Sequence, residues 1–134
     1  GKQENLNAIA DREILTLGGL YVVLVLVYVF FEKVIINYRP IIMEGETEAE
    51  ASFPSSHTML VCVVMGSAIM LLGRYIKDEK IRRVLKIVFY LVIAVTVLGR
   101  LFSGVHWLTD ILGGVLISIC LLSIFAILLP KRED

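Results

Sequence analysis

The sequence predicts an all-α integral membrane protein, a helical bundle of about four transmembrane helices that forms one membrane-embedded domain over residues 1–134. The chain is 57% hydrophobic with a mean hydropathy of +0.83, whereas ordinary soluble domains are roughly 45–50% apolar. The apolar residues lie in four long runs, each close to the roughly 20 residues that a helix needs to cross a bilayer. The runs are too long for strands and lack the alternation of period two that strands show.

The predicted spans cover about residues 14–37, 57–76, 84–102 and 107–129. The first span is uncharged from Ile14 through Phe31. Pro40 ends this helical unit, because the residue before a proline avoids the helical conformation. Ser55 and Ser56 are good N-caps for the second span.

The connections between the spans are expected to lie outside the hydrocarbon. The linker 74–83 is short and charged, so the second and third spans should be antiparallel neighbours. The acidic stretch 41–53 is interpreted as a solvated loop. Gly113 and Gly114 are expected to allow close packing of the fourth span against another helix.

Positive charge is distributed unevenly between the two sides of the predicted bundle. If the four spans cross in turn, both termini and the linker 74–83 lie on one side, which holds all the basic residues except Lys33, Arg39 and Arg100. The positive-inside rule predicts that this side, with the N- and C-termini, is cytoplasmic. The other side is then extracytoplasmic in a multi-pass protein of the cell membrane. The formal net charge is zero, which gives no indication of a nucleic-acid partner.

The expected extracytoplasmic side gathers polar residues that are unusual beside apolar spans: Arg39, Ser55, Ser56, His57, Arg100, His106 and Asp110. Polar groups at membrane depth cost several kcal/mol unless they are paired or solvated, so such a cluster suggests a site. Guanidinium groups suit phosphate oxygens, and a helix N-terminus offers free N–H groups to an anion. Two histidines can act as nucleophile and general acid near neutral pH. This inventory predicts phosphoryl transfer without a metal ion or other cofactor.

His106 and Asp110 are four residues apart, so on a helix they share one face about one turn apart. In that geometry the carboxylate fixes the tautomer of the imidazole and stabilises its charged form. Taken singly, the other residues have simpler interpretations, with Ser55 as a helix cap and both arginines as snorkelling side chains. Their occurrence together on one side favours a site.

Three motifs follow one another along the chain: Arg39-Pro40, then Pro54-Ser55-Ser56-His57, then Arg100-Leu-Phe-Ser-Gly-Val-His106-Trp-Leu-Thr-Asp110. In order and spacing they resemble the type 2 phosphatidic acid phosphatase family, of the lipid phosphatase and vanadium haloperoxidase superfamily. The family pattern is Lys-x6-Arg-Pro, Pro-Ser-Gly-His and Ser-Arg-x5-His-x3-Asp. Gly99 stands in the place of the usual Ser, and Ser56 in the place of the Gly. The resemblance extends from about Ile14 to Leu129.

The resemblance implies a role for each matching residue. His106 would attack phosphorus to form a phosphohistidine, and Asp110 would hold its other ring nitrogen. His57 would protonate the leaving oxygen, after which water would release phosphate. The charge on the phosphoryl oxygens would be stabilised by Arg39, Arg100, Ser55 and the N–H groups near Ser56 and His57.

The chain departs from the family pattern in two ways. The Lys of the first motif should lie seven residues before Arg39, where this chain has Glu32. Lys33 is one residue away, a rotation of about 100° on a helix, and would reach phosphate only through a shifted backbone or its long flexible side chain. Relatives commonly have six spans, so the two that are missing here would lie upstream of Gly1.

These observations predict an enzyme, an integral membrane lipid phosphatase acting on a phosphomonoester or diphosphate headgroup at the extracytoplasmic interface. Candidate substrates are phosphatidic acid, phosphatidylglycerophosphate and a polyprenyl diphosphate such as undecaprenyl diphosphate, and the motifs select none of them. They also leave the oligomeric state open. A non-catalytic anion- or lipid-binding bundle with a degenerate site is the main alternative, favoured by Glu32. A vanadate-dependent haloperoxidase is disfavoured in a membrane-embedded chain, and a scaffold or channel would not explain the two histidines.

Overall fold

The computed structural model describes residues 1–35, 38, 40, 53–104 and 106–131, and Arg39 and most of the acidic stretch 41–53 lie outside these ranges. The described residues form four helices, α1 (Lys2–Lys33), α2 (Ser56–Tyr75), α3 (Glu79–Phe102) and α4 (Leu108–Leu128). Each of these helices is long and apolar enough to cross a membrane. The prediction of an all-α membrane bundle is confirmed, and the chain is a multi-pass membrane protein.

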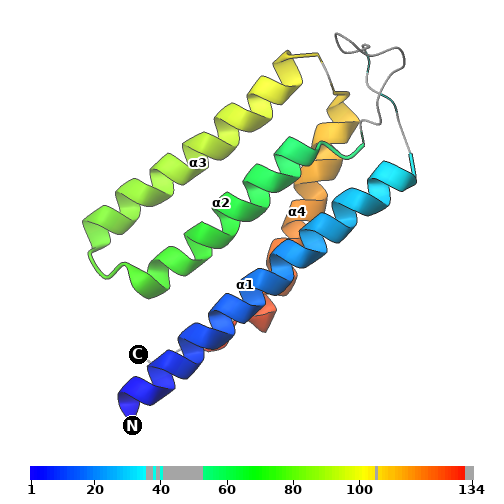
Figure 1. The fold of residues 1–134 in the computed structure, drawn as a ribbon. Helices are drawn as coiled ribbons and strands as arrows, with labels where there is room; N and C mark the ends of the chain where they lie inside the picture. Colours follow the sequence, from blue (N-terminus) through cyan, green and yellow to red (C-terminus); the bar gives the residue numbers. More distant parts are fainter. Residues whose placement is uncertain (36–37, 39, 41–52, 105, 132–134) are drawn as a thin grey trace.

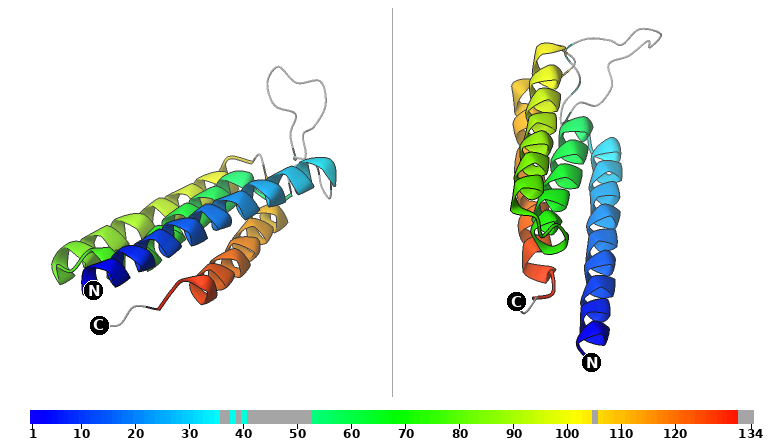
Figure 2. Two further views of the ribbon diagram at one scale, coloured as in Figure 1. Left: turned by 60° about the horizontal axis from the view of Figure 1, so that its bottom comes forward. Right: turned by 90° about the vertical axis from the view of Figure 1, so that its left-hand side faces the viewer.

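The helices run so that the motif residues collect at one end of the bundle. Figure 1 shows α2 and α3 as antiparallel neighbours, as the short linker predicted, with α1 and α4 alongside α2. The end that holds Lys33, Ser55, Arg100 and His106 is called the motif end below. The N-terminus and the end of α4 lie toward the opposite end, called the terminal end (Figures 1 and 2).

The first helix differs from the predicted span 14–37 because it begins at Lys2. Residues 2–13 are polar but consist mostly of good helix formers, and the side-chain amide of Gln3 donates to Asn7 Oδ1 at 3.1 Å, one turn later. The helix ends at Lys33, and Val34 has an extended conformation. The charged N-terminal part of α1 therefore continues the apolar span as one helix.

The third helix begins five residues before the predicted span 84–102. Asp78 is its N-cap, and Asp78 Oδ1 accepts hydrogen bonds from the backbone N–H groups of Lys80 and Ile81 at 3.0 and 3.2 Å. The cap satisfies donors that a helix N-terminus leaves unpaired, so the charged residues 79–83 are helical. The other two spans, α2 and α4, begin and end within one residue of their predictions.

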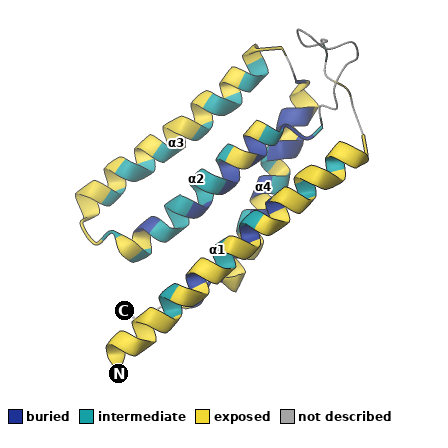
Figure 3. Cartoon of the chain, in the orientation of Figure 1, coloured by how far each residue is buried: buried dark blue, intermediate teal, exposed yellow. Residues whose placement is uncertain are grey.

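The buried core lies between α1, α2 and α4 and consists of Leu20, Leu24, Met59, Val63, Leu121, Phe125 and Leu129. All residues of α3 are described and none is buried, whereas α2 and α4 both carry buried residues, on α4 as far as Phe125. Figure 3 shows this difference between α3 and α2. The exposed surfaces of the helices are rich in large apolar side chains. In a membrane these surfaces face hydrocarbon, so their exposure carries no penalty.

Glycines allow α2 and α4 to approach closely at the motif end. A Cβ at Gly114 would lie 3.0 Å from the carbonyl oxygen of Ser55 and 3.2 Å from Thr58 Cβ, and a Cβ at Gly113 would overlap the ring of Phe53. The expectation of close packing against another helix is confirmed for Gly114, whereas Gly113 packs against the ring of Phe53, which precedes α2. A larger residue at Gly114 would crowd the N-terminus of α2.

A buried polar cluster holds the bundle together toward the terminal end. Glu13 of α1 is 1% exposed. Its Oε2 accepts a hydrogen bond from Arg74 Nη1 at 2.9 Å, and its Oε1 accepts one from the Tyr75 hydroxyl at 2.9 Å. Arg74 Nη1 also donates to the carbonyl oxygen of Pro130 at 2.6 Å. The cluster thus joins α1, α2 and the segment after α4 through groups that satisfy one another.

Candidate active site

The site begins where the first turn of α4 meets the residue that caps α2. The backbone N–H of Ser55 donates to the carbonyl oxygen of Asp110 at 3.0 Å. Both residues are fully buried. This bond fixes the second and third motifs against each other, although they lie 55 residues apart in the chain (110 minus 55).

Asp110 holds the histidine of the third motif and the start of α4 at the same time. Its Oδ2 accepts a hydrogen bond from the backbone N–H of Trp107 at 2.8 Å and lies 3.8 Å from His106 Nδ1. In return, the N–H of Asp110 donates to the Trp107 carbonyl oxygen at 3.0 Å. The carboxylate therefore lies near the ring of His106, at ion-pair distance should the imidazole be protonated, and its own position is fixed by the helix terminus.

The pairing of His106 with Asp110 was expected, but its expected helical geometry is wrong. Trp107 is the N-cap of α4, so His106 lies before the helix and not on it. The reason is the capping bond from the Trp107 N–H to Asp110, which makes Trp107 the N-cap, so that the helix begins at Leu108, two residues after His106. The four-residue spacing still brings the two side chains together, because the chain turns into the helix between them.

Both members of this pair are removed from solvent. His106 is 5% exposed and Asp110 is 0% exposed. Asp110 Oδ1 is buried and has no hydrogen-bond partner among the described residues. A buried carboxylate oxygen in that state carries a desolvation cost, which a positive charge on the neighbouring imidazole would reduce.

The side chain of Ser55 acts as a helix cap in this structure. Its Oγ donates to Thr58 Oγ1 at 2.9 Å and accepts from the backbone N–H of Thr58 at 3.4 Å. Ser56, the first residue of α2, is partly exposed. The predicted phosphate-binding role of both serines stays a prediction.

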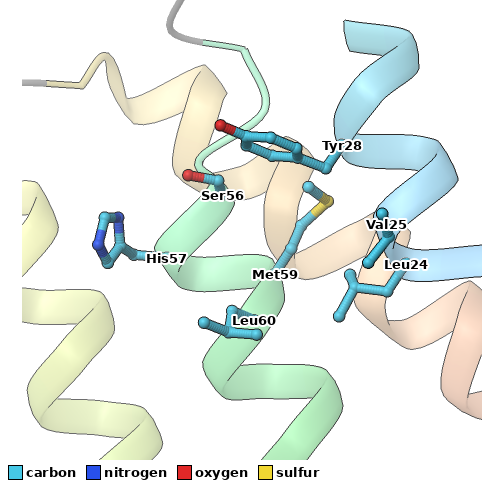
Figure 4. A pocket seen from close by; sticks show the side chains of 7 residues that line it. All are labelled: Leu24, Val25, Tyr28, Ser56, His57, Met59 and Leu60. Atoms are coloured by element: carbon cyan, nitrogen blue, oxygen red, sulfur yellow. The ribbon is translucent and has the colours of Figure 1, made fainter. Parts of the chain in front are cut away.

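His57 and Arg100 lie at the motif end but on other helices than the His106–Asp110 pair. His57 is in the first turn of α2 and exposed, and its imidazole points away from α1, toward the side on which α3 lies (Figure 4). Arg100 is in the last turn of α3 and partly buried. A histidine open to solvent and a histidine buried beside a carboxylate suit two different roles, proton transfer and nucleophilic attack.

Only part of the first motif lies among the described residues. Arg39 lies outside the described residues, so its predicted contact with phosphate stays a prediction. Lys33 and Glu32 are both exposed in the last turn of α1. The predictions about these two residues, that Glu32 occupies the family's lysine position and that Lys33 reaches phosphate only by an adjustment, therefore stay predictions.

Trp107 is a site residue that sequence reasoning missed. Its indole N–H donates to the carbonyl oxygen of Tyr38 at 2.7 Å, which ties the residue before Arg39 to the residue after His106. The sequence could have predicted this bond, because the indole N–H of a tryptophan beside apolar segments needs a hydrogen-bond acceptor. Thr58, which completes the cap of α2, was missed as well.

The described residues contain no group of three His, Cys, Asp or Glu side chains that could hold a metal ion. Searches of curated proteins and of solved structures gave no match. A sequence profile of the PAP2 superfamily matches residues 14–134. The match covers almost the whole chain and includes every motif residue discussed above. The chain therefore belongs to the PAP2 superfamily, whose members are generally phosphatases.

Proposed function

We propose that the protein is a lipid phosphatase that removes phosphate from a phosphomonoester or diphosphate headgroup through a phosphohistidine on His106, without a metal ion. The observation that carries the proposal is the buried pair of His106 and Asp110, with Nδ1 3.8 Å from the carboxylate. A carboxylate beside Nδ1 favours the tautomer in which Nε2 keeps its lone pair. Nε2 is then the nucleophilic nitrogen.

In the first half of the reaction, His106 Nε2 attacks phosphorus and the bond from phosphorus to the leaving oxygen breaks. His57 donates its proton to that oxygen, so the dephosphorylated lipid leaves as a neutral alcohol or as a lipid monophosphate. Asp110 stabilises the positive charge that remains on the ring of His106. The exposure of His57 supports this role, since the residue can exchange its proton with water.

In the second half, a water molecule attacks the phosphorus of the phosphohistidine. His57, now neutral, accepts a proton from that water, and the bond between phosphorus and Nε2 breaks. Inorganic phosphate leaves, and both histidines return to their starting states. The phosphoryl oxygens would be held by the N-terminal N–H groups of α2, Arg100 and Arg39, because phosphoryl transfer depends chiefly on positioning and charge stabilisation.

The direct test is phosphate release in detergent with excess chelator, from phosphatidic acid, phosphatidylglycerophosphate and a polyprenyl diphosphate. We expect His106→Ala to lower kcat by about 10³-fold or more. Ser123→Ala is the control, because Ser123 is exposed on α4 and bonds only to its own helix at Ile119. Full activity of His106→Ala would show that another residue is the nucleophile.

His57→Ala separates the proton donor from the nucleophile. With phosphatidic acid the leaving alkoxide needs a proton, so kcat should fall by about 10²–10⁴-fold. With p-nitrophenyl phosphate the leaving group is already a weak base, so the formation of the phosphoenzyme should be much less affected. An equal loss of that first step with both substrates would remove His57 from the role of general acid.

Glu32 favours one other function, a bundle that binds anions or lipids without turnover, because it replaces the lysine of the family pattern. Saturable vanadate binding without hydrolysis of any substrate would support that alternative. We also expect Glu32→Lys to change substrate preference or affinity in the same panel. Identical kinetics across the panel would place Glu32 outside the site.

The proposed orientation puts the motif end outside the cytoplasm, supported by the excess of basic residues toward the terminal end. Ser103 and Lys77 are exposed at opposite ends of α3 and form a matched pair. In a chain without its native cysteines, Ser103→Cys should react with an impermeant maleimide on intact cells, and Lys77→Cys only after permeabilisation. The reverse pattern would invert the proposed topology.

A further inference from the structure

The first turns of α3 carry a basic face that the proposed reaction does not use. Glu79, Arg82, Arg83 and Lys86 line a hollow of about 180 Å³ at the terminal end. Their spacing of three and four residues places all four on one face of the helix. Three cations and one carboxylate give this face a net charge of +2 (3 minus 1). It is called the α3 basic face below.

The cations of the α3 basic face are open to a ligand. Arg82 Nη1 donates to the carbonyl oxygen of Ile76 at 3.1 Å, which holds Arg82 against the linker from α2. Arg83 and Lys86 make no hydrogen bond or ion pair with the residues that the structure describes, and Glu79 forms no ion pair with either of them. Guanidinium and ammonium groups in this state suit the oxygens of a phosphate group.

An apolar groove adjoins the α3 basic face. Its volume is about 280 Å³, and it lies between α2, α3 and α4, with Gly66, Met70, Tyr90, Ile93 and Ile119 among its lining residues. Tyr90 is four residues after Lys86 and seven after Arg83, so it continues the same face of α3. The groove is found where α3 and α4 diverge toward the terminal end (Figures 1 and 2). It is called the α3–α4 groove below.

The dimensions of the α3–α4 groove match one leaflet of a bilayer. Ile93 is ten residues beyond Arg83, which is about 15 Å along the helix axis and half of the roughly 30 Å hydrocarbon core. Tyr90 is 58% exposed and Ile119 is 54% exposed, so the groove is open to the surrounding lipid. A hydrocarbon chain that enters from the side would therefore have its headgroup at the level of the α3 basic face.

We propose that the α3 basic face and the α3–α4 groove together bind one anionic phospholipid of the leaflet at the terminal end. Its phosphate lies on Arg83 and Lys86, and one acyl chain fills the groove between α3 and α4. The site is at the opposite end from His106, so this lipid is a bound structural lipid and not a substrate. The inference does not depend on the proposed function.

Two observations favour this occupant. The net charge of the basic face favours an anionic headgroup over a zwitterionic one, because each Lys or Arg near a membrane surface adds about 1 kcal/mol of attraction. In addition, α3 has no buried residue, and a chain in the groove would supply packing between α3 and α4. An acidic soluble peptide would satisfy the charge but would leave the groove empty.

The charge test compares two anionic and zwitterionic lipids of equal chain length. In native mass spectrometry we expect wild type to bind dioleoyl phosphatidylglycerol more tightly than dioleoyl phosphatidylcholine, and Arg83→Gln/Lys86→Gln to lower this preference by about tenfold or more. Lys2→Gln/Arg12→Gln is the matched control, because it removes the same charge from exposed positions of α1 at the same end. An equal loss in both double variants would show a general attraction to positive charge and would overturn the proposal.

The chain test fills the α3–α4 groove with a larger side chain. Ile119→Trp should lower the affinity for phosphatidylglycerol by about tenfold, as for steric changes in apolar pockets. Ile127→Trp is the control, because Ile127 is on the same helix, 80% exposed and outside the groove, and it should bind as wild type does. Ile93→Trp repeats the test from the opposite wall if Ile119→Trp does not fold. Unchanged affinity in a folded groove variant, or equally tight binding of chain-free glycerophosphoglycerol, would overturn the proposal.

Cross-linking locates the bound chain directly. Phosphatidylglycerol with a diazirine in its acyl chain should label wild type at Tyr90, Ile93 and Ile119, and much less in Arg83→Gln/Lys86→Gln. Labels spread evenly over the exposed helix faces would indicate only the surrounding bilayer lipid and would overturn the proposal. None of these readouts requires hydrolysis, so an inactive protein with the expected labels would contradict the proposed function alone.

Discussion

Among the described residues, each end of the bundle buries one carboxylate, but the two carboxylates are satisfied to different degrees. Both oxygens of Glu13 accept hydrogen bonds at 2.9 Å, one from Arg74 and one from Tyr75. Asp110 has one oxygen on the Trp107 N–H, with His106 Nδ1 3.8 Å away, and its Oδ1 has no hydrogen-bond partner among the described residues. Burial of a carboxylate therefore does not by itself identify the site.

The two buried carboxylates have different basic partners, an arginine beside Glu13 and a histidine beside Asp110. Arginine stays protonated at any physiological pH, so the pair of Glu13 and Arg74 has one charge state and can only hold helices together. Histidine gains and loses a proton near neutral pH, so the charge on His106 can change during a reaction. The comparison teaches that a buried carboxylate with an incomplete shell and a titratable partner indicates chemistry.

The largest expected effect separates catalysis from folding at Asp110. Asp110→Asn can still accept the Trp107 N–H and cap α4, but it cannot stabilise a cationic His106. We expect kcat to fall by about 10³–10⁴-fold with little change in thermal stability. Asp78→Asn is the matched control, because Asp78 caps α3 in the same way and should leave both quantities nearly unchanged. If Asp110→Asn kept an activity within tenfold of wild type, Asp110 would be a structural carboxylate like Glu13, and the two ends would not differ in function.

The next effect should appear in stability and not in chemistry. Glu13→Ala leaves Arg74 without its carboxylate, and we expect the free energy of unfolding in detergent to fall by about 3 kcal/mol. This value is at the low end of the destabilisation expected when one partner of a buried ion pair is removed, because the Arg74 side chain is 22% exposed. The kcat of the folded fraction should stay within about threefold of wild type. Glu32→Ala, an exposed glutamate on the same helix, should change stability by at most about 0.5 kcal/mol. Loss of turnover in a stable Glu13→Ala protein would contradict the structural role of this end.

A smaller effect should follow from separating α2 and α4 at the motif end. Gly114→Ala places a Cβ 3.0 Å from the Ser55 carbonyl oxygen, which should destabilise the protein by about 1–3 kcal/mol and lower kcat by about tenfold. Gly73→Ala is the control, because its Cβ meets nothing within 4 Å and helix propensity favours alanine by about 1 kcal/mol. Similar behaviour of the two variants would mean that close packing does not set the site geometry.

The smallest expected effect concerns the link between the first and third motifs. Trp107→Phe keeps the aromatic bulk but removes the donor to the Tyr38 carbonyl oxygen, a loss of about 1 kcal/mol. We expect KM for phosphatidic acid to rise by about fivefold at similar kcat, since the segment next to Arg39 loses an anchor. Phe102→Leu, at a ring 79% exposed at the same end, should leave KM unchanged. An unaltered KM for Trp107→Phe would show that this bond does not help to position the segment.

Hydropathy was sufficient to predict the helices, because each span has to satisfy its own backbone in lipid. It could not predict where polar helix continues, as at the N-terminal part of α1. The early start of α3 could have been predicted from Asp78, a residue type that favours the N-cap position. Hydropathy alone places a helix start at the first apolar residue and so misses a capped, charged turn.

The pairing of His106 with Asp110 could be predicted from spacing, although the turn that produces it could not. The contact between Ser55 and Asp110 depends on tertiary packing through Gly114, which no local pattern reports. The cluster of Glu13, Arg74 and Pro130 was missed for the same reason, since its members come from three distant segments. Sequence patterns thus predicted the local pair of His106 and Asp110, but not the contacts between residues that are distant in the chain.

The central claim, that His106 is the nucleophile, is tested most directly by trapping its phosphorylated form. His57→Ala should form the phosphoenzyme from p-nitrophenyl phosphate but hydrolyse it slowly, because the water then lacks its base. Mass spectrometry of the alkali-quenched protein should locate an acid-labile phosphoryl group on His106, and none should be found in the double variant His57→Ala/His106→Ala. Continued turnover with the phosphoryl group on another residue, or with no phosphoenzyme at all, would contradict the account.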